Sequence, residues 1–72
     1  MNITDENKEY IPICNKLNLT IEEASQYSGI GTKRLRDITD SKDCDFVMYV
    51  GNSKKLIKRL EFEKWNSKTK NI

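Results

Sequence analysis

The chain is 72 residues long and carries 13 Lys or Arg against 11 Asp or Glu, a net charge of +2. This length allows one small domain, no apolar run approaches the roughly 20 residues of a membrane span, and no signal peptide is visible, so we expect a cytoplasmic location. Histidine, the commonest general base and metal ligand, does not occur, which argues against an enzyme, a metal site or a bound cofactor.

The N-terminal segment is polar over residues 1–9 and shows no apolar periodicity, so we predict a mobile tail there. The apolar run from Tyr10 to Ile13 predicts a short strand or a single helical turn that covers the core. Cys14 adjoins this run, and we expect it to be buried. Cys14 and Cys44 lie far apart and form no metal-ligand pair, so both are expected to be free thiols.

The clearest local signal is a capping box formed by Thr20 and Glu23. In this motif the Thr hydroxyl accepts from the backbone N–H of the Glu, whose carboxylate accepts from the backbone N–H of the Thr. The motif predicts a helix that begins after Thr20 and ends at about Tyr27. Leu19, directly before the cap, can pack against Ala24.

A glycine-containing turn, SGIG at residues 28–31, ends this helix and directs Ile30 inward. Thr32 is predicted to cap a second helix that runs from residue 33 to about 40. Leu35 and Ile38 lie three residues apart on one face of that helix and predict its buried side. A polar loop follows.

The second half of the chain predicts a hairpin and a final helix. Residues 46–50 are β-branched and aromatic and predict a strand, residues 51–53 have turn chemistry, and residues 54–58 predict the returning strand. A short helix is predicted from residue 59 to about 65. The polar residues 67–72 predict a mobile C-terminal tail.

Four aromatic side chains in this half could form a stacking platform for single-stranded nucleic acid or could fill the core. The spacing favours the core, because so small a chain needs its aromatic side chains inside. The four residues are Phe46, Tyr49, Phe62 and Trp65.

Together these elements predict a small α+β domain over residues 10–66, a winged helix-turn-helix. The second helix of such a motif enters the major groove of DNA, and the hairpin forms a wing whose basic tip contacts the minor groove or phosphate. Basic residues outnumber acidic ones over residues 31–59, which favours a polyanionic partner. Two alternatives remain: an ordinary helix pair with a polar outer face, and lysines that only protect a hairpin edge.

The stretch IPICNKLNLTIEEASQYSGIGTKRLRDI, followed by GNSKKLIKRLEFEKW, resembles the excisionases of conjugative transposons, small relatives of the winged-helix domain of MerR-type regulators. The resemblance covers about residues 10–65. It implies binding and bending of double-stranded element DNA, in support of a tyrosine integrase that carries out the excision chemistry. By position it implies DNA contacts on the second helix at Thr32, Lys33, Arg34 and Arg36, on the wing at Asn52, Ser53, Lys54 and Lys55, and at the wing's foot at Lys58 and Arg59.

Asp37 departs from this pattern, because a negative charge on the outer helix face suits DNA poorly. It could pair with Lys33 or accept a hydrogen bond from a cytosine amino group. A small transcriptional regulator with the same domain and a protein-binding adaptor with a basic face are the competing functions. The chain lacks the long heptad helix by which MerR-type regulators dimerise, which favours the excision role. We expect a monomer in solution and leave open whether it binds DNA cooperatively.

Overall fold

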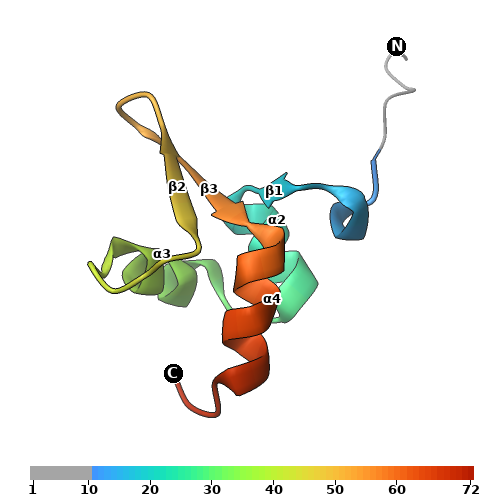
Figure 1. Cartoon of the computed structure of the whole chain (residues 1–72), viewed down its shortest axis with the longest axis vertical. Coiled ribbons are helices and arrows are strands. Elements are labelled where there is room, and N and C mark those ends of the chain that lie inside the picture. The colour runs from blue at the N-terminus through green and yellow to red at the C-terminus, as the bar shows by residue number, and fades with distance from the viewer. Residues whose placement is uncertain (1–10) are drawn as a thin grey trace.

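The computed structural model describes residues 11–72, so the tail predicted for residues 1–9 lies outside the described part of the chain. The elements are a short 3-10 helix η1 (Ile13–Asn15), β1 (Asn18–Leu19), α2 (Ile21–Ser28), α3 (Thr32–Asp40), β2 (Val47–Val50), β3 (Lys54–Lys58) and α4 (Arg59–Lys68). Helices α2 and α3 form the helix-turn-helix, and the β2–β3 hairpin projects beyond the helices as a wing (Figure 1). The predicted α+β winged helix-turn-helix is confirmed.

Helix α2 begins at the predicted capping box. The Thr20 hydroxyl accepts from the Glu23 N–H at 3.1 Å, and the Glu23 carboxylate accepts from the Thr20 N–H at 3.0 Å. The helix ends at Gly29, whose φ of 83° is left-handed and whose N–H donates to the Ser25 carbonyl at 2.8 Å. Glycine adopts this conformation without the steric cost that a Cβ would bring, which fixes the turn into α3.

Helix α3 begins one residue earlier than expected. Gly31 is its N-cap, and Leu35 N–H donates to the Gly31 carbonyl at 3.0 Å, so the helical ladder already includes Thr32. Thr32 is therefore the first helical residue and not the cap, and that prediction was wrong. Because the cap residue is a glycine, no side-chain hydrogen bond closes this end of the helix.

The three strands form an antiparallel sheet in the order β1-β3-β2. Ile57 is central, with Leu19 as its Cα partner on β1 and Val47 on β2. The hairpin was predicted well, since β3 has the expected bounds and β2 starts one residue later than expected. Strand β1 was not predicted, because two residues are too few to show alternation.

The core lies between the sheet and the helices and consists of Leu19, Ile21, Ala24, Leu35, Phe46, Ile57 and Phe62. The partly buried Trp65 packs against it, with its ring centroid 5.0 Å from that of Phe46 and 5.7 Å from that of Phe62. The core position is thus confirmed for three of the four aromatic residues. It was wrong for Tyr49, which is 62% exposed because the outer half of the wing extends beyond the helices.

A single helical turn precedes β1, as one of the two expectations had it, but it covers Ile13–Asn15 rather than the run from Tyr10 to Ile13, and Tyr10 lies outside the described residues. Ile13 packs against the core, but Cys14 is exposed, so its predicted burial was wrong. A turn of three residues directs only one side chain inward. Both cysteines are free thiols, and burial raises the pKa of the half-buried Cys44 thiol.

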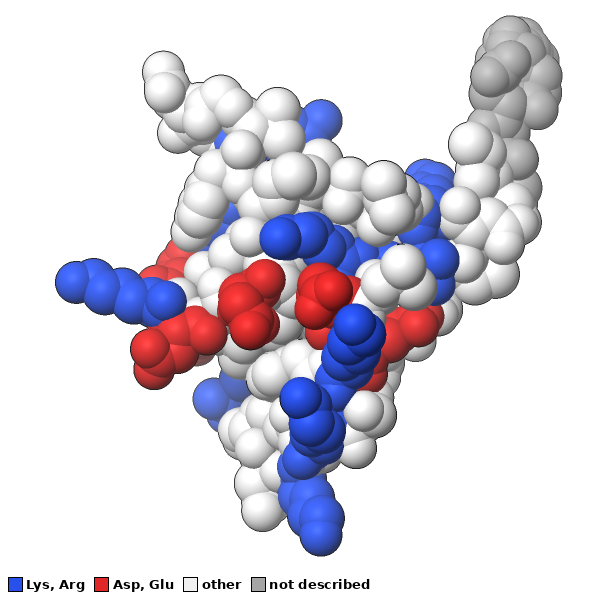
Figure 2. All heavy atoms as spheres, in the orientation of Figure 1, with Lys and Arg blue, Asp and Glu red and all other residues white. Residues whose placement is uncertain are grey.

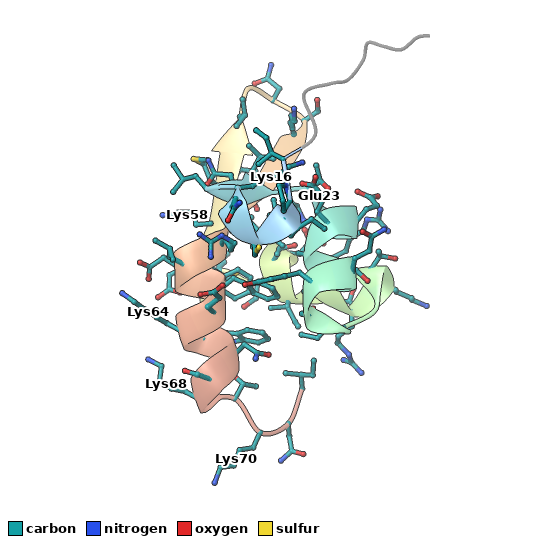
Figure 3. All side chains as sticks on the ribbon, turned by 90° about the vertical axis from the view of Figure 1, so that its right-hand side faces the viewer. Lys16, Glu23, Lys58, Lys64, Lys68 and Lys70 are labelled. Carbon is teal, nitrogen blue, oxygen red and sulfur yellow. The ribbon has the colours of Figure 1, made fainter. Side chains whose placement is uncertain are left out.

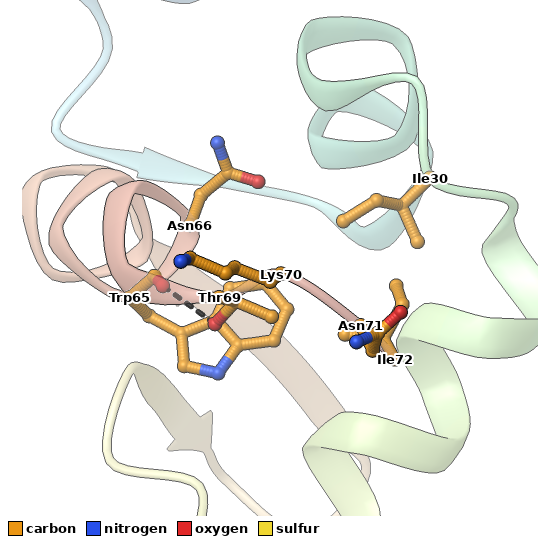
Figure 4. Close-up of a pocket in the computed structure, with 7 residues that line it drawn as sticks. All are labelled: Ile30, Trp65, Asn66, Thr69, Lys70, Asn71 and Ile72. Carbon is orange, nitrogen blue, oxygen red and sulfur yellow. Dashed lines mark hydrogen bonds between the residues drawn. The ribbon is translucent and has the colours of Figure 1, made fainter.

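Helix α4 continues through Lys68, past its predicted end near residue 65. The Thr69 hydroxyl donates to the Trp65 carbonyl at 2.7 Å and satisfies one of the last carbonyls of the helix. Residues 69–72 then line a small cavity of about 120 Å³ together with Ile30 and Trp65 (Figure 4). Mobility of residues 67–72 remains a prediction, although the first two of them are helical. Within residues 11–72, no helix has the length and apolar character needed to cross a membrane.

Candidate nucleic-acid interface

The outer face of α3 carries the predicted groove contacts. Lys33, Arg34 and Arg36 are exposed there, and Thr32 is half-buried at the start of the helix. Arg36 donates from Nη2 to the Glu22 carboxylate of α2 at 3.2 Å, and both side chains are more than half exposed. Exposed ion pairs contribute at most about 1 kcal/mol, so Arg36 can exchange Glu22 for a nucleic-acid partner.

Two acidic residues share this helix with the basic ones. Asp37 is exposed, and no ion pair within residues 11–72 joins it to Lys33. Asp40, the last residue of α3, is also exposed but forms an ion pair with Lys55 of the wing. The two carboxylates therefore have different surroundings on the same helix.

The wing tip is free of the rest of the domain. Asn52, Ser53 and Lys54 are exposed at the β2–β3 turn, where Gly51 has a left-handed φ of 68°. Figure 1 shows this turn at the far end of the hairpin, away from α4. These three predicted contact residues lie where a neighbouring DNA backbone can reach them.

Lys55 differs from its neighbour Lys54. Side chains alternate along a strand, so Lys55 lies on the same face of β3 as the buried Ile57 and points toward α3. Its side chain is only 22% exposed, and its ammonium donates to the Thr39 hydroxyl at 3.1 Å and to the Asp40 carboxylate. This position could have been inferred from the alternation with Ile57.

The two residues predicted as contacts at the foot of the wing also differ in their exposure. Lys58 is exposed on the opposite face of β3. Arg59 is 17% exposed, and it donates to the Lys16 carbonyl at 2.6 Å and to the Glu63 carboxylate at 2.9 Å. Arg59 thus joins the segment before β1 to α4, and its guanidinium is largely occupied within the domain.

Glu63 accepts a second hydrogen bond, from the Tyr27 hydroxyl of α2. This bond, followed by the one from Arg59, lowers the pKa of Glu63, and the same carboxylate raises the pKa of Tyr27. The hydrogen bond between Tyr27 and Glu63 links α2 to α4. Sequence spacing gave no sign of it, because Tyr27 and Glu63 are 36 positions apart.

A row of lysines extends along α4 and past both of its ends, and of these only Lys58 was predicted as a contact. Figure 3 shows Lys64 and Lys68 on the side of α4 that is turned away from α2, with Lys58 directly before the helix and Lys70 beyond its end. The spacing of Lys64 and Lys68 by four residues places them on one helix face. Figure 2 shows acidic side chains across the middle of one face of the molecule and a row of basic ones below them, so this face is mixed in charge.

The described residues offer neither a deep pocket nor a metal site. One open hollow on the surface has a volume of about 290 Å³ and is lined by Leu17, Asn18, Met48, Lys58, Leu60 and Glu61. Across residues 11–72, no three His, Cys, Asp or Glu side chains are grouped so that they could hold a metal ion.

Comparison with known proteins gives two matches. Residues 1–71 match a family described as "Excisionase from transposon Tn916". Over 55 residues the chain is 44% identical to the excisionase from transposon Tn916 of Streptococcus agalactiae serotype V (strain ATCC BAA-611 / 2603 V/R), an alignment that covers 75% of this chain and 81% of that protein. The resemblance noted in the sequence is confirmed.

Proposed function

The chain belongs to the Tn916 excisionase family, and from this premise we propose that it binds and bends double-stranded DNA of a mobile element through α3 and the wing, in support of an integrase. Proteins of this family take part in transposon excision as DNA-binding accessory proteins and not as enzymes. Strand cleavage and joining then belong to the partner, for which a tyrosine integrase is the expected class.

The observation that carries the proposal is the arrangement of two basic surfaces on neighbouring elements. Lys33, Arg34 and Arg36 are exposed on α3, and Lys54 is exposed at the wing tip. A helix of this kind fits the major groove, while a basic hairpin tip contacts the adjacent backbone or minor groove. The domain holds α3 and the wing tip at a fixed geometry. A duplex that contacts both is therefore favoured when it bends toward them.

Titration of the protein with a duplex from the end of its element tests DNA binding. If about four phosphates are neutralised, log K falls against log salt concentration with a slope of roughly −3 to −4. A duplex of scrambled sequence is the control and should bind more weakly with a similar slope. Absence of binding to any duplex at low salt would refute the proposal and favour a protein-binding role.

Bending and integrase support need separate measurements. Bending is measured by energy transfer between dyes at the two ends of the bound duplex, whose distance should shorten on binding. Integrase support is measured as the yield of excised element, with and without this protein, in a reaction that contains the element's integrase. Arg36→Ala should lower both signals, since Arg36 lies on the exposed face of α3. Binding without any increase in excision would leave transcriptional control as the better account.

A further inference from the structure

The wing is joined to the C-terminal end of α3 by side chains from both of its strands. Tyr49 and Lys55 are direct cross-strand partners in the hairpin. The Tyr49 hydroxyl donates to the Thr39 carbonyl at 3.5 Å, and the Lys55 ammonium donates to the Thr39 hydroxyl at 3.1 Å and to the Asp40 carboxylate. All these bonds converge on the last two residues of α3, and we call Thr39, Asp40, Tyr49 and Lys55 the wing clamp.

The electrostatics of the helix end explain why a lysine belongs there. The last carbonyls of a helix lack intrahelical partners and carry partial negative charge. Helix α3 has no basic residue in its own last turn, and Asp40 adds a full negative charge at this end. Lys55 supplies the missing positive charge from the wing.

Thr39 connects this charge to the interior of the domain. It is fully buried, and its hydroxyl donates to the Leu35 carbonyl at 2.9 Å while it accepts from Lys55. The donor of this buried hydroxyl is thus satisfied, and Lys55 provides a hydrogen-bond donor to its oxygen, so displacement of Lys55 would remove that partner. The clamp therefore has one fixed and buried side.

The outer half of the wing has little else to hold it. Tyr49 is 62% exposed, Val50 is 45% exposed, and Lys54 is exposed at the turn. A two-stranded hairpin without a covered face is only marginally stable in water. The clamp is thus the side-chain contact that joins this outer half of the wing to α3.

We propose that the wing clamp is a positioning device that fixes the wing tip relative to α3 before DNA arrives, so that Lys55 acts on DNA through the wing and not as a phosphate ligand. This inference rests on the proposed DNA-binding function. A wing that is already ordered spares the complex the loss of conformational entropy on binding, which is the advantage of preorganisation.

A matched pair of charge substitutions on α3 separates the clamp from general electrostatics. Asp37→Asn and Asp40→Asn each remove one exposed carboxylate from the same helix, but only Asp40 holds the wing. Loss of a negative charge near DNA should tighten binding, and Asp37→Asn is expected to do so. Asp40→Asn is expected to weaken binding by about three- to tenfold, with protection of the DNA backbone at both the wing and α3 retained, because the same contacts form once the wing has been ordered.

Lys55→Met distinguishes the clamp from a phosphate contact. Loss of a phosphate ligand makes the salt slope about one unit less steep, whereas loss of positioning lowers affinity with little change in slope. The double variant with Asp40→Asn should bind no more weakly than either single variant, since both substitutions break one interaction. Additive losses together with a shallower slope would overturn the clamp.

Backbone ¹⁵N relaxation of residues 51–54 in the free protein gives a readout that needs no DNA. Asp40→Asn and Lys55→Met should increase fast motion there, and Asp37→Asn should not, while circular dichroism checks that each variant is folded. A wing as rigid in Asp40→Asn as in the unmodified chain, with DNA binding tightened as in Asp37→Asn, would refute the clamp. If no form of the protein bound any duplex, the proposed function would fail. The relaxation data would still show whether Asp40 and Lys55 restrict the motion of the wing in the free protein.

Discussion

At the scale of single residues, the basic side chains fall into two groups that their identity alone does not distinguish. Lys54 and Lys58 extend into solvent, whereas Lys55 and Arg59 are held by partners within the domain. Alternation along β3 already places Lys55 on the face of Ile57, so its direction could be predicted from the sequence. For Arg59, the ion pair with Glu63 follows from their i, i+4 spacing, but the bond to the Lys16 carbonyl could not be predicted, because Lys16 is 43 positions away.

Arg59 and Lys54 should therefore respond in opposite ways to substitution. Arg59→Met removes hydrogen bonds to Lys16 and Glu63, so it should lower the midpoint of thermal unfolding and leave the salt slope of DNA binding nearly unchanged. Lys54→Ala should leave thermal unfolding unchanged and make the salt slope about one unit less steep. Thermal denaturation and salt titrations of the two variants provide the measurement. Similar effects from both would mean that Arg59 also contacts phosphate.

Glu22 is expected to act as an internal competitor of DNA for Arg36. Arg36 must break its exposed ion pair with Glu22 before it can contact DNA, and such a pair contributes at most about 1 kcal/mol. Glu22→Gln removes that competition and should strengthen DNA binding by about two- to fivefold. Glu61→Gln is the control, because Glu61 is an exposed acid that pairs with Lys64 on α4. Fluorescence anisotropy measures the affinity of both variants for DNA. Equal gains in affinity would mean that the change in net charge, and not the release of Arg36, causes the effect.

At the scale of secondary-structure elements, local signals were sufficient where the interaction is local. The capping box that begins α2 and the turn between β2 and β3 depend on residues a few positions apart, and both were predicted correctly. The cap of α3 was not predicted correctly. Thr32 has a side chain suited to an N-cap, but in the structure the N-cap is Gly31, whose backbone is extended, and Thr32 is already helical. Strand β1 exists only because β3 pairs with it, an interaction between distant parts of the chain.

The capping box of α2 should make stability depend on pH. The hydrogen bond from Lys16, followed by that from the Thr20 N–H, lowers the pKa of Glu23 below its ordinary value of 4.5. A carboxyl group whose pKa is lower in the folded state stabilises fully above its unfolded pKa, and this contribution is lost as the pH falls through the folded pKa. The native chain should therefore lose part of its stability below about pH 4.5.

Glu23→Gln isolates this contribution, since Gln keeps the shape of the capping box but carries no charge. The variant should be less stable than the native chain at neutral pH, and the difference should shrink at acid pH. Urea unfolding at a series of pH values measures it. A difference that does not change with pH would show that the charge of Glu23 has no part in stability.

At the scale of the whole molecule, one small core holds every element in place. Trp65, the single tryptophan of the sequence, packs against Phe46 from the loop before β2 and shares α4 with Phe62. The spacing of the apolar residues indicated such a core and several of its members, among them Leu35, Phe46 and Phe62. The position of Tyr49 outside it depends on how far the wing extends, which no local pattern encodes.

Unfolding should accordingly be a single cooperative transition. Trp65 fluorescence reports the aromatic cluster and far-ultraviolet circular dichroism reports the helices, and in urea the two curves should coincide. Coincidence is expected because loss of the core removes the support of α2, α3 and α4 together. Two separate midpoints would instead indicate that the helix-turn-helix retains structure after α4 has detached.

The two faces of α3 differ in what they can tolerate over evolutionary time. Its buried residues are Leu35 and Thr39, while Lys33, Arg34 and Arg36 contribute nothing to the core. Substitutions on the outer face can therefore accumulate without loss of the fold, and a mobile element could acquire new target sites by them. The end of the helix has no such freedom, because a change there alters the geometry with which every target is held.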